Sequence, residues 1–389
     1  MIGVMMTEMT SRQRVMTALN HQEPDRVPFD CTFGNTAYNR LEKYLGFKPQ
    51  QEVLPGSPWL SVRPPPEFLS ELGVDLFYLG LGGWGDTEKF EYGMQTYTDE
   101  WGIPFRKAEN PSGVHYEFSG HPLADATIKD LEDYPWPDPY DPVLVEGLED
   151  KACDLYENTE FALVGRFNNP IFEQAFMLRG MEQLFMDMAL DPDFVGVLMD
   201  KLTDIAVSLI EVGLKACGEY LTILRLAGDD MGQQGGTLLS PAMFRSIIKP
   251  RFARLYREAK DMLRQYNPDG KMMAHTDGDV YPFIPDYIEM GLDVLNPLQP
   301  YVAEMEHDKI KGEFGERLSF HGGIDLQKVL PFGTPGEVRA EAVKTIHALG
   351  VGGGYILAPT HYLLPDVPPE NVIALRDAVM EEGRYPLEG

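Results

Sequence analysis

From residue 142 onward, short apolar segments alternate regularly with segments of helical length. The six apolar segments are residues 161–167, 221–226, 271–275, 293–296, 318–323 and 354–358. Strands that are apolar throughout are typical of a parallel sheet covered on both faces by helices. Two earlier candidates, residues 27–31 and 74–79, raise the count to about eight. Eight parallel strands close a barrel, so the prediction is an α/β fold of the (β/α)8 TIM-barrel type.

An open, doubly wound sheet is the alternative, but no glycine-rich dinucleotide turn follows the first predicted strand. A length of 389 residues suits one barrel domain with insertions. Residues 80–140 interrupt the alternation with polar and aromatic residues separated by turns, a pattern typical of antiparallel ribbons. We therefore predict a single domain over residues 1–389, with an N-terminal extension and a β-rich insertion at 80–140.

Charge and cysteine content narrow the function classes. The chain has 61 acidic against 33 basic residues, a formal net charge of −28. This balance argues against nucleic-acid and membrane partners, and it disfavours highly anionic substrates unless basic residues concentrate locally. Three scattered cysteines form no CxxC pair, and no segment approaches a transmembrane length. We expect a cytoplasmic protein that acts on a small molecule; its oligomeric state, a homodimer included, stays open.

Groups that bind metals or move protons follow two of the apolar segments. His275 ends the segment 271–275, and Asp277 follows two residues later. In an extended backbone, side chains two residues apart point to the same side. His361 follows the segment 354–358 and joins them if both segments belong to one sheet. Two imidazoles and a carboxylate suit Zn²⁺, Fe²⁺ or Mn²⁺. The sequence predicts that these three residues are catalytic and hold a metal; the alternative is a metal-free cluster that grips substrate.

Other polar residues also stand where the predicted strands end, which is where barrels carry their active sites. Asp230 and Glu173 are the candidates for proton transfer. The candidates for substrate binding are Asp229, Gln233, Asn296, Gln299, His321, Arg166 and Tyr362. Each has a structural alternative: an aspartate in the 229–230 pair caps the following turn, Glu173 lies on a helix surface, and a histidine serves as a hydrogen-bonded structural residue.

Several segments together resemble the uroporphyrinogen decarboxylase superfamily over nearly the whole chain. They are residues 9–16, 24–28, 99–102, 228–232, 239–241 with 249–251, 275–278, 295–299 and 353–359. The resemblance implies a TIM barrel whose active site lies at the carboxyl ends of the strands. The haem-pathway decarboxylase, however, has an early arginine-rich segment and a nearby catalytic aspartate. Here residues 26–33 supply one arginine, and residues 77–79 contain no aspartate.

The chain is more similar to the cobalamin-dependent methyltransferase branch of that superfamily. Those zinc enzymes use a His-x-Cys pair and a later cysteine, and here the matching positions are His275, Asp277 and His361. The resemblance implies a divalent metal, zinc in particular, and cobalamin supplied by a partner corrinoid protein. The implied reaction moves a methyl group between that protein and a small methylated, in particular methoxylated, substrate. The alternatives are a carboxy-lyase acting on a smaller acid and a non-catalytic barrel that binds a small molecule.

Overall fold

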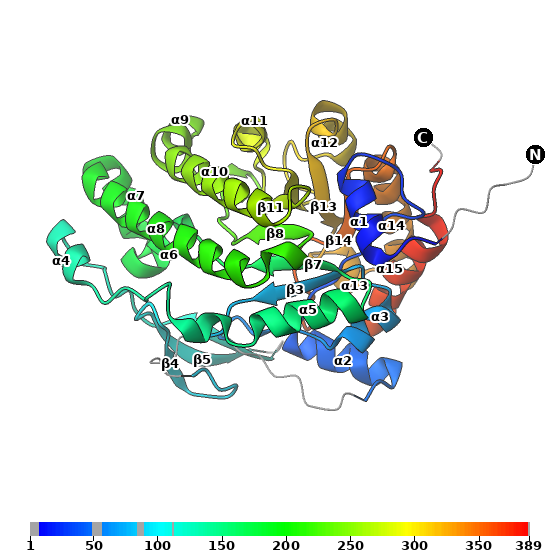
Figure 1. The fold of residues 1–389 in the computed structure, drawn as a ribbon, viewed down its shortest axis with the longest axis horizontal. Helices are drawn as coiled ribbons and strands as arrows, with labels where there is room; N and C mark the ends of the chain where they lie inside the picture. The colour runs from blue at the N-terminus through cyan, green and yellow to red at the C-terminus, as the bar shows by residue number, and fades with distance from the viewer. Residues whose placement is uncertain (1–7, 49–56, 84–88, 111–112, 388–389) are drawn as a thin grey trace, which may run out of the picture.

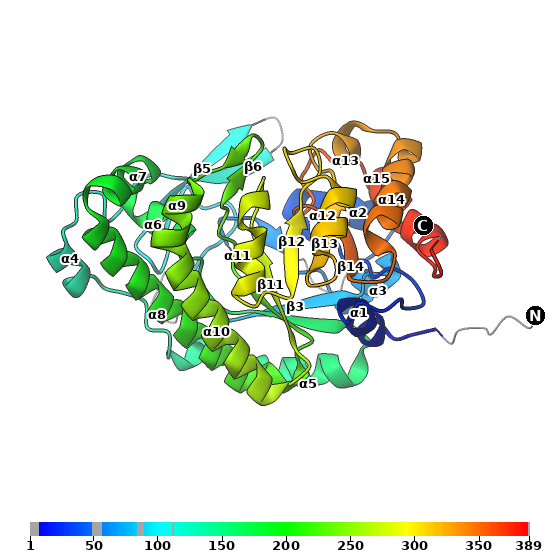
Figure 2. The ribbon, with the colours of Figure 1, turned by 90° about the horizontal axis from the view of Figure 1, so that it is seen from above.

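A curled, parallel sheet of seven strands forms the centre of the computed structural model, which describes residues 8–48, 57–83, 89–110 and 113–387 (Figures 1 and 2). The strand order is β14-β13-β12-β11-β8-β7-β3. The bounds are β3 (Leu76–Gly80), β7 (Ala162–Arg166), β8 (Ile223–Leu226), β11 (Lys271–His275), β12 (Val294–Leu298), β13 (Ser319–Ile324) and β14 (Tyr355–Pro359).

Residues 27–33 lie between the two edge strands of this sheet. Leu357 in β14 donates its N–H to Pro28 O and accepts one from Asp30, both at 2.9 Å. On the other side, Asp75 N donates to Phe29 O at 2.8 Å, immediately before β3. The segment thus takes the place of the eighth strand, although Pro28 has no N–H and its pairing is limited to isolated bridges. The predicted TIM-barrel fold is confirmed.

Helices surround the sheet (Figures 1 and 2). Those that connect the strands include α5 (Leu148–Asn158), α8 (Pro192–Cys217), α10 (Lys249–Tyr266), α11 (Ile284–Glu289), α12 (His307–Phe314) and α14 (Pro335–Gly350), and α15 (Pro369–Glu382) follows the last strand. The rest are α1 (Ser11–Leu19), α2 (Asn35–Leu45), α3 (Pro66–Leu72), α4 (Ile128–Asp133), α6 (Phe172–Arg179), α7 (Met181–Leu190), α9 (Pro241–Met243) and α13 (Val329–Phe332). In their described part, none is both long enough and apolar enough to cross a membrane.

The helical region between β7 and β8 is divided into α6, α7 and α8. Gly180 separates α6 from α7 with φ at 88°, a value that favours glycine, and Pro192 begins α8. The insertion after β3 contains the antiparallel sheet β4 (Thr96–Thr98), β5 (Pro104–Asn110) and β6 (Gly113–Phe118). The predicted β-rich insertion is confirmed in its described part; residues 84–88 and 111–112 lie outside it.

Side-chain alternation along the strands divides the barrel interior into two layers. The lower layer is apolar and joins Leu76, Ala162, Val164, Ile223, Met273, Val294 and Ile356 to Val15 and Leu19 of α1. Residues two positions further along a strand point to the same side. The upper layer therefore begins with Tyr78, Arg166, Arg225, His275 and Asn296. An apolar floor beneath a polar layer places the site at the carboxyl ends of the strands.

The opposite end of the barrel contains a buried ion-pair network built from segments that carried the family resemblance. Asp75 is fully buried and accepts bonds from Arg14 Nη1, Arg26 Nη1 and Ser11 Oγ, each at 2.7 Å. Arg14 also pairs with Asp25 at 2.7 Å. These residues tie α1 and the segment 25–29 to β3, so their role is structural.

Replacing Asp75 by alanine leaves the buried guanidinium group of Arg14 and the half-buried one of Arg26 without their shared carboxylate. Because breaking a buried pair costs about 3–5 kcal/mol, we expect the free energy of unfolding to fall by that amount. Urea unfolding followed by circular dichroism measures it, with the exposed Asp269→Ala as the matched control. Equal unfolding midpoints for the two variants would refute the structural role.

Candidate active site

His275, the last residue of β11, has a fixed ring orientation. Its Nδ1 lies 2.7 Å from Asn296 Oδ1, and because a carbonyl oxygen can only accept, Nδ1 carries the proton. The ring also lies against Gly228, where a Cβ would come within 2.6 Å of His275 Cδ2. Burial, followed by the charge of Arg225, lowers the pKa of His275 well below its usual value. The imidazole is therefore neutral, and its Nε2 lone pair faces the barrel mouth.

A chain of buried hydrogen bonds extends this arrangement across the barrel interior. Asn296 Nδ2 donates to His321 Nδ1 at 2.6 Å, and His321 Nε2 then donates to Asp30 Oδ2 at 2.9 Å. Tyr78 Oη donates to the same oxygen at 2.6 Å. Each polar group in this relay, which we define as Tyr78, Asp30, His321, Asn296 and His275, has a partner of the right kind. Fully satisfied networks of this type specify one arrangement of their members.

His275, Asp277 and His361 come together at the barrel mouth. Each offers one ligand atom, and these atoms all lie within 4.8 Å of one another. His275 Nε2 is 3.9 Å from Asp277 Oδ2, and the two imidazole ring centroids are 6.0 Å apart. Burial, followed by Arg225, lowers the pKa of His361 to about 4, so both imidazoles are neutral at pH 7.

The donor set fits a dication. Tetrahedral ligands at about 2.1 Å from a metal lie roughly 3.4 Å apart, so side-chain shifts of about 1 Å close the cluster. Two neutral imidazoles and one carboxylate are ligands that Zn²⁺, Fe²⁺ and Mn²⁺ accept. Asn296 supplies the second hydrogen bond by which metal-binding histidines are commonly oriented.

Acidic side chains crowd beside the cluster. Asp230 Oδ1 lies 3.8 Å from His275 Nε2 and accepts the N–H of Asp277 at 2.8 Å. Asp230 N donates to Glu173 Oε1 at 3.1 Å. Burial, followed by the charges of Asp230 and Asp229, raises the pKa of Glu173 to about 9. Burial, followed by Asp230, raises the pKa of Asp277 to about 7. Glu173 is therefore protonated at neutral pH and can donate a proton.

Two glycine-containing loops interlock to hold these acids. Gly278 has φ at 83°, and a Cβ on it would overlap the backbone of Gly232. Asp279 N donates to Gln233 O at 3.0 Å, and Gly278 N donates to Gln299 Oε1 at 2.9 Å. The loops after β8 and β11 are thus fixed to each other through their backbones. Gln299, predicted to bind substrate, holds the loop that carries Asp277.

Asp229 is another predicted substrate-binding residue that the structure places differently. It is buried, and its carboxylate accepts the N–H groups of Ile171, Phe172 and Glu173 at 2.6 to 3.1 Å. These bonds cap the amino end of α6, where a negative charge is stabilised. These contacts position Glu173, and contact of Asp229 with substrate stays a prediction.

Asn296 and His321 are also buried, and the relay uses both polar atoms of each, so their contact with substrate likewise stays a prediction. They orient His275. Gln233 is exposed on the short strand β9 (Gly232–Gln233), which pairs with β10 (Gly236–Thr237). Tyr362 stands beside the site, with its ring centroid 4.2 Å from that of His361 and its Oη donating to Trp59 O at 3.3 Å.

Sequence reasoning missed Asp30, Tyr78, Arg63 and Arg225. Asp30 and Tyr78 lie in predicted strands that are otherwise apolar. Each is a polar residue at a position that faces the barrel interior, and this feature could have identified them. Arg225 had the same signal, as the charged residue within the segment 221–226. Arg63 follows the short strand β2 (Ser61–Val62), which pairs with β1 (Phe33–Gly34), and no local pattern marks it.

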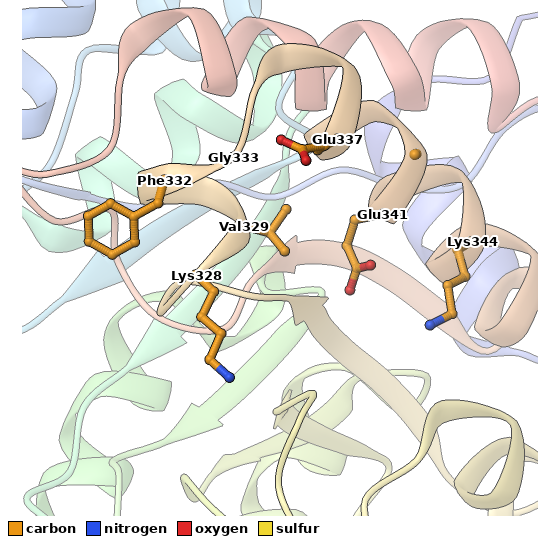
Figure 3. A pocket seen from close by; sticks show the side chains of 8 residues that line it. Lys328, Val329, Phe332, Gly333, Glu337, Glu341 and Lys344 are labelled. Carbon is orange, nitrogen blue, oxygen red and sulfur yellow. The ribbon is translucent and has the colours of Figure 1, made fainter.

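A hollow of about 480 Å³ lies elsewhere, between α13 and α14 (Figure 3). Its two acidic residues have structural partners: Glu337 completes the capping box of α14, and Glu341 accepts a bond from Tyr301 at 3.0 Å. It contains no histidine or cysteine. The barrel mouth is therefore the better candidate for chemistry.

Comparison with known proteins supports the family resemblance. The family model described as uroporphyrinogen decarboxylase (URO-D) matches residues 113–382. The uroporphyrinogen decarboxylase of Magnetococcus marinus is 24% identical over 234 residues, which are 58% of this chain and 60% of that enzyme, under two-thirds of its length. The Pseudoalteromonas translucida enzyme is 22% identical over 281 residues, 69% of this chain and 73% of that enzyme.

A solved structure with the same fold is a methyltransferase from Methanosarcina mazei. The match has a TM-score of 0.64 and covers 96% of this chain and 99% of that one. At 20% sequence identity, it establishes the shared fold.

Asn296→Leu tests the relay. Leucine keeps the volume but accepts no bond from His275 Nδ1, so the ring loses its orientation and we expect zinc affinity to fall about 10- to 100-fold. A zinc titration against a competing chelator measures this change. The exposed Gln265→Leu is the control, and equal zinc affinity for both variants would show that the relay does not orient His275.

Proposed function

Because the chain belongs to the uroporphyrinogen decarboxylase family, we propose that it is an enzyme that transfers a methyl group between a small methoxylated substrate and a corrinoid protein. The supporting observation is the meeting of His275 Nε2, Asp277 and His361 beside a protonated Glu173 at one barrel mouth. Free cysteines at positions 31, 153 and 217 suit a reducing cytoplasm, where a reduced corrinoid persists.

His275, Asp277 and His361 would hold a divalent metal, zinc in particular. When bound, such an ion supplies a Lewis acid toward an ether oxygen. The methyltransferase branch that the sequence resembles has cysteines where this chain has Asp277 and His361. A carboxylate and an imidazole donate less electron density than thiolates, which favours an oxygen substrate over activation of a thiol.

The remaining chemistry belongs to the chain itself. When bound, a reduced corrinoid protein would supply the nucleophile that takes the methyl group, and the bond between the methyl carbon and the substrate oxygen would break. The electron pair of the broken bond stays on oxygen, which takes the proton of Glu173. Asp229 holds Glu173 at the amino end of α6, and Asp230 keeps it protonated by its nearby charge.

A carboxy-lyase that acts on a small acid is the second candidate, favoured by Arg166 and Arg225 in the polar layer of the barrel. Uroporphyrinogen is a poorer fit than such an acid. Arg26, the arginine of the segment 26–33, pairs with Asp75 at 2.7 Å on the far side of the apolar floor. It is therefore committed to the opposite end of the barrel from the candidate site.

A methyl-transfer assay tests the proposal. Purified protein, loaded with zinc, is incubated with a reduced corrinoid protein and a panel of methoxylated acids, methoxylated alcohols and methylamines. We expect the absorbance of a methylated corrinoid to appear with a methoxylated donor, to be lost in His275→Ala and to persist in the exposed His347→Ala. Release of CO₂ without methyl transfer would instead establish the lyase.

The pH dependence of this reaction follows from Glu173. Because the protonated acid is the active form, activity falls as pH rises toward about 9, and a bound dication shifts that fall to lower pH. Glu173→Gln removes the proton donor, so we expect a loss of about 10²- to 10⁴-fold and no remaining dependence on pH in this range. A variant that kept the wild-type alkaline limb would assign that limb to another group.

A further inference from the structure

Three arginine side chains meet at the rim of the barrel mouth. Arg166 ends β7, opposite Gly80 of β3, and the register of β7 with β8 places it level with Arg225. Both follow inward-facing residues by two positions, so their side chains point into the barrel. Arg63 reaches the same rim, because a Cβ on Gly80 would overlap Arg63 Nη2 and lie 3.3 Å from Arg166 O.

These guanidinium groups have no acidic partner among the described residues. Arg225 Nη2 donates a long bond of 3.4 Å to Asn296 Oδ1, while Arg63 and Arg166 make no side-chain hydrogen bond or ion pair in that part of the chain. By contrast, arginines such as Arg14 and Arg179 pair with carboxylates at 2.7 Å. In a chain of net charge −28, three neighbouring cations without a partner call for an external anion.

The electrostatics agree with a cluster that faces an open space. Burial, followed by Arg225 and Arg63, lowers the pKa of Arg166 to about 10, so the three charges act on one another. Arg63 and Arg166 are nevertheless exposed to solvent. An anion from solution can therefore reach both side chains, and three neighbouring positive charges attract it.

We propose that Arg63, Arg166 and Arg225 bind a carboxylate of the substrate and so make this a site for methoxylated carboxylic acids. The methoxy group of the substrate rests on the proposed function, whereas the binding of a carboxylate does not. Arg225 and His275 bond to the same oxygen, Asn296 Oδ1, so the anion site adjoins the candidate metal site within the reach of a small molecule.

A monoanion fits better than a phosphate dianion. Asp30, Asp277 and Asp230 lie close enough for their charges to act on Arg225, so the net positive charge of the site is modest. Guanidinium groups pair with a carboxylate through two parallel hydrogen bonds. The half-buried ring of Tyr362 lies against His361 and adds an aromatic surface, which makes methoxybenzoates suitable probes.

Calorimetric binding of the full chain, without any corrinoid, tests the inference. The probes are 2-, 3- and 4-methoxybenzoate, with 4-methoxybenzamide as the neutral counterpart and 4-methoxyphenyl phosphate as the dianion. We expect at least one benzoate to bind and the amide to bind about 10- to 100-fold more weakly, as the loss of charge-assisted hydrogen bonds predicts. Equal binding of acid and amide, no binding of any benzoate, or tighter binding of the phosphate would overturn the proposal.

Variants connect the binding to the residues. Arg166→Gln and Arg63→Gln, which leave the relay intact, should each weaken benzoate binding about tenfold or more with an unchanged unfolding midpoint. Arg257→Gln is the control, since that side chain is 65% exposed. Unchanged affinity in both rim variants would overturn the assignment. Methyl transfer plays no part in the binding measurement. A failure to bind benzoates can therefore be distinguished from a failure of the proposed reaction.

Discussion

The hydrogen bond from His275 Nδ1 to Asn296 Oδ1 decides what the barrel mouth can do. It fixes the protonated nitrogen on the side of the barrel interior and leaves the Nε2 lone pair facing Asp277, Asp230 and the open end. Asn296 keeps this direction because its amide is held by His321, which in turn is held by Asp30. The candidate metal ligand is therefore oriented by residues from three other parts of the chain.

Burial then assigns a protonation state to each group around that ligand. Removal from water disfavours charge, so the two imidazoles are neutral and Glu173 keeps its proton. The polar layer rests on an apolar floor, and the buried members of the relay are satisfied by one another. The guanidinium groups at the rim have no acidic partner in the part of the chain that the structure describes, and Arg225 makes one long bond to Asn296. Two neutral imidazoles, an acid that keeps its proton and a cluster of guanidinium groups thus lie within one barrel mouth.

The fold and the centre of the site were predictable because both depend on short-range patterns. Apolar segments alternating with helical ones indicated the barrel, and the two-residue spacing of His275 and Asp277 indicated one ligand face. The prediction that His361 completes the group of ligands required only that the two strands be parallel members of one sheet.

The relay and the arginine rim were harder to predict because they depend on which strands are neighbours. Asp30 meets His321 across 291 residues of chain, a contact that strand order and register create. Asn296 and His321 were predicted as substrate contacts for the same reason. The sequence shows a polar residue at a strand end but not which side chain of the neighbouring strand will form a hydrogen bond with it. The sequence likewise does not show that Asp229 accepts hydrogen bonds from the backbone at the amino end of α6.

The most direct measurement is the crystal structure of the zinc-loaded protein, with data collected on both sides of the zinc absorption edge. We predict one anomalous peak at the barrel mouth, from a zinc ion coordinated by His275 through Nε2, by Asp277 and by His361, with His275 Nδ1 still bonded to Asn296. A zinc ion elsewhere, or bound through His275 Nδ1 with the relay broken, would contradict it.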